Sequence, residues 1–447
     1  MVQTLFLDGK ACGAEAIYAR LRAAIEAGEL AQGEALPTIR ALAEQLAVNR
    51  NTVAAAYRRL IVAGLAESAG RGGTRVAPRS RVGLPAGVHA YVPQPGLAEL
   101  ASGNPDPALL PDFGPALARL VSPPALYGQP CYEPELLAYG RDWWQRTGQI
   151  DAEFVDPLLV HGALDGIERV LAAWLAPGDT VLVEDPCFPG SLALLKQAGY
   201  NLIGLPLDDE GIVPEALEAA LARKPKALVW TPYSHNPTGI NTTPARAAQL
   251  RAVLAGVPDL LLVEDDHFAA FAPAATPSLV TAGHSRWAAL RSLSKHLGPD
   301  MRLAFLVGDA LTLARVQRRQ YLGPRWPSFV LQRLALALLA DPATDTLRNR
   351  AAALYAERHA ALCTELAALD LKPQPGGGLN VWLPLADDAA VAQALAARGY
   401  LVRTGEAFRV TRTLSALRIT SAALTPAAAR TLATALAQCL GGLGVAA

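Results

Sequence analysis

The sequence has few cysteines, and their arrangement predicts no covalent or metal-bound framework. The five, Cys12, Cys131, Cys187, Cys363 and Cys439, are scattered over 447 residues. An odd number without a Cys-x-x-Cys pair argues against both a disulfide framework and a zinc site. We therefore expect no metal centre and a reducing, cytoplasmic location.

Long hydrophobic runs are also absent. No stretch of ~18 apolar residues occurs, so no membrane span is predicted. The first ten residues lack the charged start and apolar core of a signal peptide. Because 51% of the residues are apolar and 18% are charged, the chain is expected to be globular and well cored. At roughly 100–200 residues per domain, its length predicts two to four domains.

Net charge is absent overall but not locally. The formal charge is zero, yet between Arg40 and Arg81 eight arginines stand against two acidic residues, Glu44 and Glu67. This local excess of positive charge favours an anionic partner. A merely solvated surface is the ordinary alternative, so a motif is needed to decide between them.

Three short helices are predicted at the start of the chain. Apolar residues at helical spacing indicate helices over 14–28 (Ile17, Leu21, Ala24, Ile25), 39–46 (Ile39, Leu42, Ala43, Leu46) and 50–64 (Val53, Ala56, Tyr57, Leu60). Gly28 suits the end of the first helix. Thr38 and Asn49 suit the N-caps of the other two.

A helix, a short turn and a second helix form the DNA-binding geometry in which the second helix enters the major groove. The first turn of the third predicted helix carries Arg50, Asn51 and Thr52, whose side chains suit base edges and phosphates. Residues 67–76 are predicted to form a two-stranded wing with a basic, glycine-rich tip at Arg71 and Gly72.

The segments LPTIRALAEQLAVNRNTVAAAYRRLIVAGL and GRGGTRV resemble the winged helix-turn-helix of the GntR family over residues 12–77. The resemblance implies an all-α head with a β wing that binds double-stranded operator DNA. It implies DNA contacts from Arg40, Arg50, Asn51, Thr52, Arg71 and Gly72. A small helical domain with surface arginines is the alternative. Residues 78–97, rich in proline and glycine, are predicted to be a linker.

From residue 98 onward, apolar strands alternate with helices. Strands are predicted at 158–162, 180–185, 226–230, 260–264 and 303–308, with a helix over 163–176. This alternation predicts an α/β fold with a mostly parallel sheet covered by helices on both faces. Ligands of such sheets bind at the carboxyl ends of the strands, and the polar motifs of this region lie at those ends.

The segment RSLSKHLGPDMR, residues 291–302, carries a lysine between serines with an arginine seven residues further on. Such an arrangement suits Lys295 forming a Schiff base with an aldehyde while Ser292, Ser294 and Arg302 hold a phosphate. The implied cofactor is pyridoxal 5′-phosphate (PLP). A surface lysine in a serine-rich turn is the alternative for this segment taken alone.

Other strand ends supply the partners that a pyridoxal ring needs. Asp265 suits the pyridine nitrogen, Asn236 the ring hydroxyl, and Phe188 the ring face. The helix beginning at Ala163 and Leu164 offers backbone N–H groups and a positive dipole end to the phosphate. Each residue alone has an ordinary structural explanation, but their joint order at strand ends favours a PLP site.

This order resembles the fold-type I aminotransferases from residue 98 to the C-terminus. The resemblance implies a large part at about 125–325 and a small part made of 98–124 and 326–447. It also implies a homodimer with shared sites, in which Tyr127 of the segment LYG reaches the phosphate of the neighbouring subunit. Arg418 of LRITSA would bind an effector carboxylate.

A GntR-type head on an aminotransferase-type body is the MocR/GabR architecture. The segments SGNPDP, VEDPCF, HNPTG and DDHF resemble its vitamin B6-related members. The resemblance implies a transcriptional regulator that senses PLP as its effector and controls vitamin B6 genes, rather than an enzyme. An amino-acid-sensing regulator of the GabR type and an active aminotransferase are the alternatives.

Two departures from an ordinary aminotransferase bear on this choice. The tyrosine usually found two residues after the ring-nitrogen aspartate is His267 here, and imidazole differs from phenol in reach and charge. The phosphate turn carries Ala163 and Leu164, which supply only backbone N–H groups. We expect the lack of side-chain donors in this turn to weaken PLP retention, as suits a sensor.

Overall fold

The computed structural model describes residues 13–68, 73–77, 96–153, 156–272, 275–411 and 415–444. The chain forms two compact units, Met1–Leu84 and Pro85–Ala447, called here the head and the body. The predicted DNA contacts Arg71 and Gly72, and the predicted linker up to residue 95, lie outside the described residues.

The head contains the three predicted helices and the two predicted wing strands. They are α1 (Ala14–Ala27), α2 (Ile39–Leu46), α3 (Arg50–Val62), β1 (Ala66–Ser68) and β2 (Thr74–Val76), with the two strands antiparallel. Gly28 ends α1 in the left-handed conformation, at φ 78°. The side chains of Thr38 and Asn49 accept hydrogen bonds from Ala41 N at 3.1 Å and Asn51 N at 2.8 Å, so both predicted N-caps are confirmed.

The apolar stripes of these helices form the core of the head. All four predicted residues of α1 and of α3 are buried, together with Leu42 and Ala43 of α2. Two details of the prediction were wrong. Ile39 is 37% exposed, because it is the first residue of α2 and precedes the turn that packs on α3. The third helix ends at Val62 rather than Gly64, which has φ 67° and leads into the wing.

The body is built around an eight-stranded sheet of order β5-β13-β12-β10-β9-β6-β7-β8. Its strands are β5 (Leu158–Val160), β6 (Thr180–Asp185), β7 (Asn201–Asp208), β8 (Gly211–Ile212), β9 (Ala227–Trp230), β10 (Leu261–Asp265), β12 (Trp287–Ser292) and β13 (Ala304–Gly308). Only β13 and β8 pair antiparallel with their neighbours, which confirms the mostly parallel sheet.

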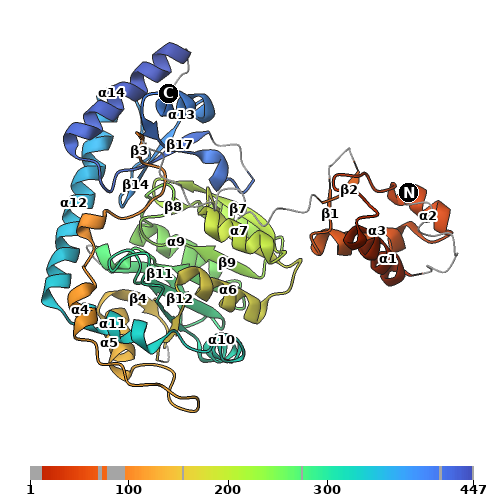
Figure 1. Ribbon diagram of the computed structural model, residues 1–447, viewed down its shortest axis with the longest axis horizontal. Helices are drawn as coiled ribbons and strands as arrows, with labels where there is room; N and C mark the ends of the chain where they lie inside the picture. The colour runs from red at the N-terminus through yellow and green to blue at the C-terminus, as the bar shows by residue number, and fades with distance from the viewer. Residues whose placement is uncertain are drawn as a thin grey trace. The chain divides into compact units, whose positions relative to one another are not determined.

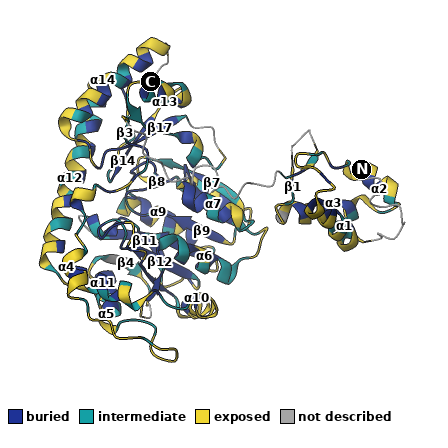
Figure 2. Cartoon of the chain, in the orientation of Figure 1, coloured by how far each residue is buried: buried dark blue, intermediate teal, exposed yellow. Residues whose placement is uncertain are grey.

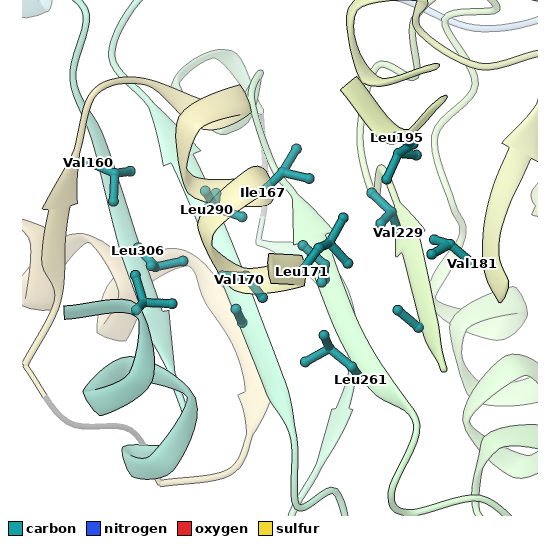
Figure 3. Packing of buried hydrophobic residues seen from close by; sticks show 14 of the residues in the cluster. Val160, Ile167, Val170, Leu171, Val181, Leu195, Val229, Leu261, Leu290 and Leu306 are labelled. Carbon is teal, nitrogen blue, oxygen red and sulfur yellow. The ribbon is translucent and has the colours of Figure 1, made fainter. Parts of the chain in front are cut away.

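Successive side chains of these strands pack alternately against helices on one face of the sheet and on the other, as expected for a sheet buried on both faces. Val181, Val263 and Leu290 pack with α6 (Ala163–Trp174), α7 (Pro189–Gln197) and α10 (Ala310–Leu322), and Figure 3 shows α6 lying across this face. Their sequence neighbours face the other layer, formed by α8 (Pro214–Leu221) and α9 (Pro244–Leu254).

The C-terminal part of the body adds a smaller layer. Its elements are α12 (Pro342–Ala367), β14 (Asn380–Pro384), α13 (Asp388–Ala396), β15 (Tyr400–Leu401), β16 (Arg403–Thr404), β17 (Ala416–Thr420) and α14 (Pro426–Leu443). The preceding helix α11 (Phe329–Leu339) instead packs with Leu136 and Phe305. Strands β14, β17 and β16 form one sheet, and β15 pairs with β3 (Ala98–Glu99). Figure 1 shows α12 running along the body from α14 to α11.

The remaining α-helices and strands of the body pack around the eight-stranded sheet. They are α4 (Gly114–Ala118), α5 (Pro134–Thr147), β4 (Gly148–Asp151) and β11 (Thr276–Thr281), and the last two pair with each other. Figure 2 shows the central strands in the dark blue of buried residues, while α12 and α14 expose their outer faces.

Within the described ranges, no helix is long and apolar enough to cross a bilayer. The four cysteines that the structure describes are free thiols. In the same described part of the chain, no group of three or more His, Cys, Asp or Glu residues is placed to hold a metal ion.

Candidate functional site

A cavity of about 200 Å³ opens at the carboxyl ends of the parallel strands of the body. All the predicted cofactor-binding residues except Tyr127 line it: Ala163, Leu164, Phe188, Asn236, Asp265, His267, Ser292, Ser294, Lys295 and Arg302. They come from five places in the sequence that only the fold brings together. Four follow the ends of β5, β6, β9 and β10, and the fifth lies between β12 and β13.

Lys295 presents a buried amine to this cavity. Its Nζ donates to the carbonyl of Gly103 at 3.3 Å. Burial and the nearby charge of Arg418 lower the pKa of Lys295 to about 8, although Asp265 opposes the shift. A lysine with such a pKa is partly neutral near physiological pH, and a neutral amine is the form that attacks a carbonyl.

Asp265 ends β10 and faces the same cavity. Burial raises its pKa to about 7, the charge of Asp266 adds to that shift, and Lys295 opposes it. Its Oδ1 is buried and has no hydrogen-bond partner among the described residues, while its Oδ2 lies 3.9 Å from His267 Nδ1. A buried carboxylate oxygen without a partner is costly, so Asp265 suits a ligand that donates a proton to it.

His267 lies beside Asp265 and lines the cavity as a neutral ring. Burial, followed by the charge of Lys295, lowers its pKa to about 4. Its Nδ1 is buried and has no hydrogen-bond partner within the described part of the chain. The imidazole is therefore available to a ligand as a neutral donor or acceptor rather than as a cation.

The other end of the cavity is suited to an anion. α6 begins there with Gly162 as an N-cap that has no side-chain hydrogen bond, so its first N–H groups and positive dipole end face outward. The guanidinium of Arg302 donates to the carbonyl of His161 at 3.4 Å, and the hydroxyls of Ser292 and Ser294 lie 2.7 Å apart. Two hydroxyls, one guanidinium and a helix N-terminus form a phosphate-type receptor.

Two predicted residues do not line the cavity. Tyr127 is 79% exposed, 5.9 Å from Trp326 between ring centroids, and carries Arg325 over its face. Arg418, on β17, is 1% exposed and donates to the Ala101 carbonyl and, at 3.2 Å, to Asn236 Oδ1. The predictions that Tyr127 reaches a neighbouring subunit and that Arg418 binds a carboxylate remain predictions.

The cavity also contains a buried acid and histidine that the sequence analysis missed. Glu184 accepts from Thr231 N at 3.1 Å, and its Oε2 lies 3.4 Å from His235 Nε2. Burial raises the pKa of Glu184 to about 8 and lowers the pKa of His235 to about 3. The acidic end of the strand VLVED and the histidine of HNPTG were the available signals.

In the head, three of the residues predicted to contact DNA lie at the start of α3. Arg50 and Asn51 are exposed and Thr52 is half-buried. Arg40 lies on α2, where its Nε donates to Glu44 at 2.9 Å in a pair exposed on both sides. An exposed pair of this kind is weak, and the contacts of these residues with DNA remain predictions.

The fold and the two sites define a class of protein in which a winged helix-turn-helix head is carried by an aminotransferase-type body. Residues 13–76 match the family of bacterial regulatory proteins of the gntR type, and residues 96–436 match aminotransferase class I and II. The chain belongs to the GntR family of transcriptional regulators, in its MocR type with an aminotransferase-like domain.

Two regulators are similar to the chain over most of its length. The vitamin B6 salvage pathway transcriptional repressor PtsJ of Salmonella typhimurium is 42% identical over 435 residues, covering 97% of this chain and 99% of that protein. The HTH-type transcriptional regulator TauR of Rhodobacter capsulatus is 30% identical over 441 residues, covering 86% of this chain and 87% of that protein.

Solved structures of aminotransferases share the fold of the body. The multiple substrate aminotransferase of Thermococcus profundus superposes with a TM-score of 0.70 at 20% identity, covering 78% of this chain and 92% of that one. The α-aminoadipate aminotransferase LysN of Thermus thermophilus gives 0.68 at 24% identity, covering 78% and 93%. These likenesses show the aminotransferase fold that the resemblance of the sequence implied.

Proposed function

We propose that this regulator captures PLP covalently on Lys295 and that its occupancy alters the binding of the head to operator DNA. One observation carries the proposal: Lys295, Asp265 and an anion-type receptor all line the same small cavity. The amine, the carboxylate and the receptor are the three groups that an aldehyde-bearing pyridine phosphate requires.

The residues present fit this group, because Asp265 Oδ1 is buried in the cavity without a partner from any residue that the structure describes. Asp265 would hold the pyridine nitrogen in its protonated form, with Asn236 and His267 near the ring hydroxyl. Arg302, Ser292, Ser294 and the start of α6 would hold the phosphate, and Phe188 would cover the ring. When bound, PLP supplies an aldehyde that condenses with a lysine amine and a ring that acts as an electron sink.

The proposed role as a sensor is supported by the form of this pocket. The phosphate turn consists of Ala163 and Leu164, which add no side-chain hydroxyl or amide, and His267 is neutral. We infer that PLP is retained less firmly than in an enzyme that keeps its cofactor through every cycle. Because PtsJ is named for the vitamin B6 salvage pathway, genes of vitamin B6 metabolism are the proposed targets.

Capture of PLP is expected to depend on pH through two groups. The pKa of Lys295 is lowered to about 8, so the neutral amine fraction, and with it the capture rate, should rise as pH increases through about 8. The pKa of Asp265 is raised to about 7, so its carboxylate form is lost below that pH and equilibrium binding should weaken there. Stopped-flow absorbance between pH 5.5 and 9 measures both. A capture rate still climbing steeply at pH 9, as for an ordinary lysine, would contradict the first assignment.

Gly162→Ala is expected to weaken PLP binding by about tenfold, roughly 1.4 kcal/mol. Gly162 has φ 96°, and a Cβ there would lie 2.7 Å from Arg302 Nη2, so the guanidinium must shift at the phosphate end. The matched control is Gly178→Ala, because Gly178 has φ 94° but open space for a Cβ. An absorbance titration with PLP compares them. Equal losses in both variants would mean that backbone strain alone is responsible.

A second candidate function is an amino acid effector, favoured by the closeness of Arg418 to Lys295 that the lowered lysine pKa reflects. The guanidinium already donates to Ala101 and Asn236, so a carboxylate would have to displace one of these contacts. An active aminotransferase is the weaker third possibility.

Gel-shift titration on the DNA upstream of the protein's own gene separates these functions. The proposal expects PLP alone to change the DNA affinity. A response that needs an amino acid in addition would favour the second function, and turnover of an amino acid with a keto acid would favour the third.

A further inference from the structure

A buried ion pair lies behind the cavity, on the opposite face of the sheet, and joins β10, which ends in Asp265, to β12, which leads to Lys295. Arg291 is in β12, and Asp266 directly follows β10. These strands are parallel neighbours in which Asp265 aligns with Leu290. Because side chains alternate along a strand, Asp265 and Ser292 line the cavity while Asp266 and Arg291 point away from it.

The contacts of this pair leave it little freedom. Arg291 Nε lies 3.2 Å from Asp266 Oδ2, which also accepts from Thr276 Oγ1 at 2.8 Å. Arg291 Nη1 donates to Thr147 Oγ1 at 2.7 Å and to the Trp143 carbonyl at 3.2 Å. Its guanidinium carbon lies 3.8 Å from the ring centroid of Trp144. Arg291 is 0% and Asp266 is 2% exposed.

A buried ion pair is a poor source of stability, because the desolvation of both charges offsets most of their attraction. The placement of this one, at the two strand ends beneath the site, therefore calls for another role. We propose that Arg291 and Asp266 are positioning residues, whose ion pair fixes the ends of β12 and β10 and so holds Lys295 and Asp265 at the spacing that PLP capture needs. This inference rests on the proposed function.

The pair also acts on Asp265 through charge. After burial, the charge of Asp266 is the next cause that raises the pKa of Asp265. The titratable groups around Asp265 are Asp266, Lys295, His267, Glu184 and Cys187. Without Arg291 the charge of Asp266 is no longer compensated. The carboxylate form of Asp265 is then harder to maintain. The pH below which PLP binding weakens, called here the acid limit, should therefore move upward.

The test compares Arg291→Gln and Arg291→Lys in the full chain, with PLP affinity measured by absorbance between pH 5.5 and 9. Arg291→Gln is expected to weaken PLP binding at least tenfold at pH 7.5 and to shift the acid limit upward. Arg291→Lys keeps a positive charge next to Asp266. Its PLP affinity and its acid limit should therefore both lie close to those of the wild type. The matched control is Arg246→Gln, because Arg246 is 7% exposed and pairs with Asp208 at 2.7 Å, away from the cavity.

Thr147→Val keeps the inference testable if Arg291→Gln does not fold. It removes one hydrogen bond of Arg291 and keeps the charge, so a two- to fivefold loss of affinity without a shift of the acid limit is expected. The inference is overturned if Arg291→Gln, or Thr147→Val in its place, binds PLP like the wild type. It is equally overturned if Arg246→Gln loses as much affinity as Arg291→Gln. A wild-type chain that binds no PLP overturns the proposed function, and this inference with it.

Discussion

Replacing Lys295 with alanine is expected to abolish the covalent capture of PLP and to weaken its binding by at least about 100-fold, roughly 2.7 kcal/mol. The amine is the only described lysine that lines the cavity, so no other described side chain there can condense with the aldehyde. The phosphate-type receptor at Arg302 and the start of α6 is left intact, so weak, noncovalent binding should remain. Absorbance titration and reduction with borohydride measure the two effects.

The matched control for this variant is Lys196→Ala, because Lys196 is an exposed lysine on α7 outside the cavity. The control should capture PLP like the wild type. The DNA affinity of Lys295→Ala without PLP should also equal that of the wild type, since the head is unchanged, but added PLP should no longer alter it. A Lys295→Ala chain that still yields a borohydride-stable product at full stoichiometry would show that the reactive amine is elsewhere.

Replacing Arg50 with alanine is expected to weaken operator binding by about 1–3 kcal/mol, roughly 5- to 150-fold. Arg50 is the first residue of α3, exposed, and preceded by the N-cap Asn49. An arginine in the first turn of the second helix of such a motif is placed against base edges and phosphates of the major groove. Fluorescence anisotropy with the upstream DNA, at a fixed salt concentration, measures the loss.

Arg22→Ala provides the comparison within the head. Arg22 is an exposed arginine of α1 that pairs with Glu26 at 2.7 Å, so its removal changes the net charge by the same amount. We expect it to cost less than threefold in DNA affinity. If both variants lose the same affinity, net charge rather than the recognition helix governs binding. The PLP affinity of the body should be unaffected in either variant.

Much of the head could be predicted from the sequence because its signals are local. Helical spacing of apolar residues, two side-chain caps and a left-handed glycine each act within one turn, and all of them are found in the structure. The exposure of Ile39 was not predicted. The spacing of apolar residues shows which side of α2 is apolar, but it does not show how far along that side the neighbouring helix packs.

In the body, the strands that end in functional residues were predictable, but their order in the sheet was not. Each of these strands is a short apolar run, and Asp265 and Phe188 lie at or shortly after the end of such a run. The strand β12, which leads to Lys295, was not predicted, and neither was β7. The reversal of β13 between β12 and β5 depends on long-range pairing that no local pattern encodes.

Contacts across the sheet were the least predictable part of the site. Arg291 and Asp266 are polar residues within or next to apolar strands, and only the three-dimensional pairing shows that they neutralise each other. Glu184 and His235 are likewise distant in sequence and adjacent in the fold, and no local pattern shows their proximity. The hydrogen bonds of Arg418 with Ala101 and Asn236 likewise depend on how the C-terminal part of the body packs against the rest of it.

Borohydride reduction of the wild-type chain with added PLP, followed by tryptic digestion and mass spectrometry, tests the central claim most directly. A pyridoxyl group on Lys295 would block cleavage there, so the label should be found on one peptide spanning residues 292–302, between the cleavage sites at Arg291 and Arg302. The account predicts stoichiometric labelling of that peptide. Labelling spread over surface lysines, or none on residues 292–302, would contradict it.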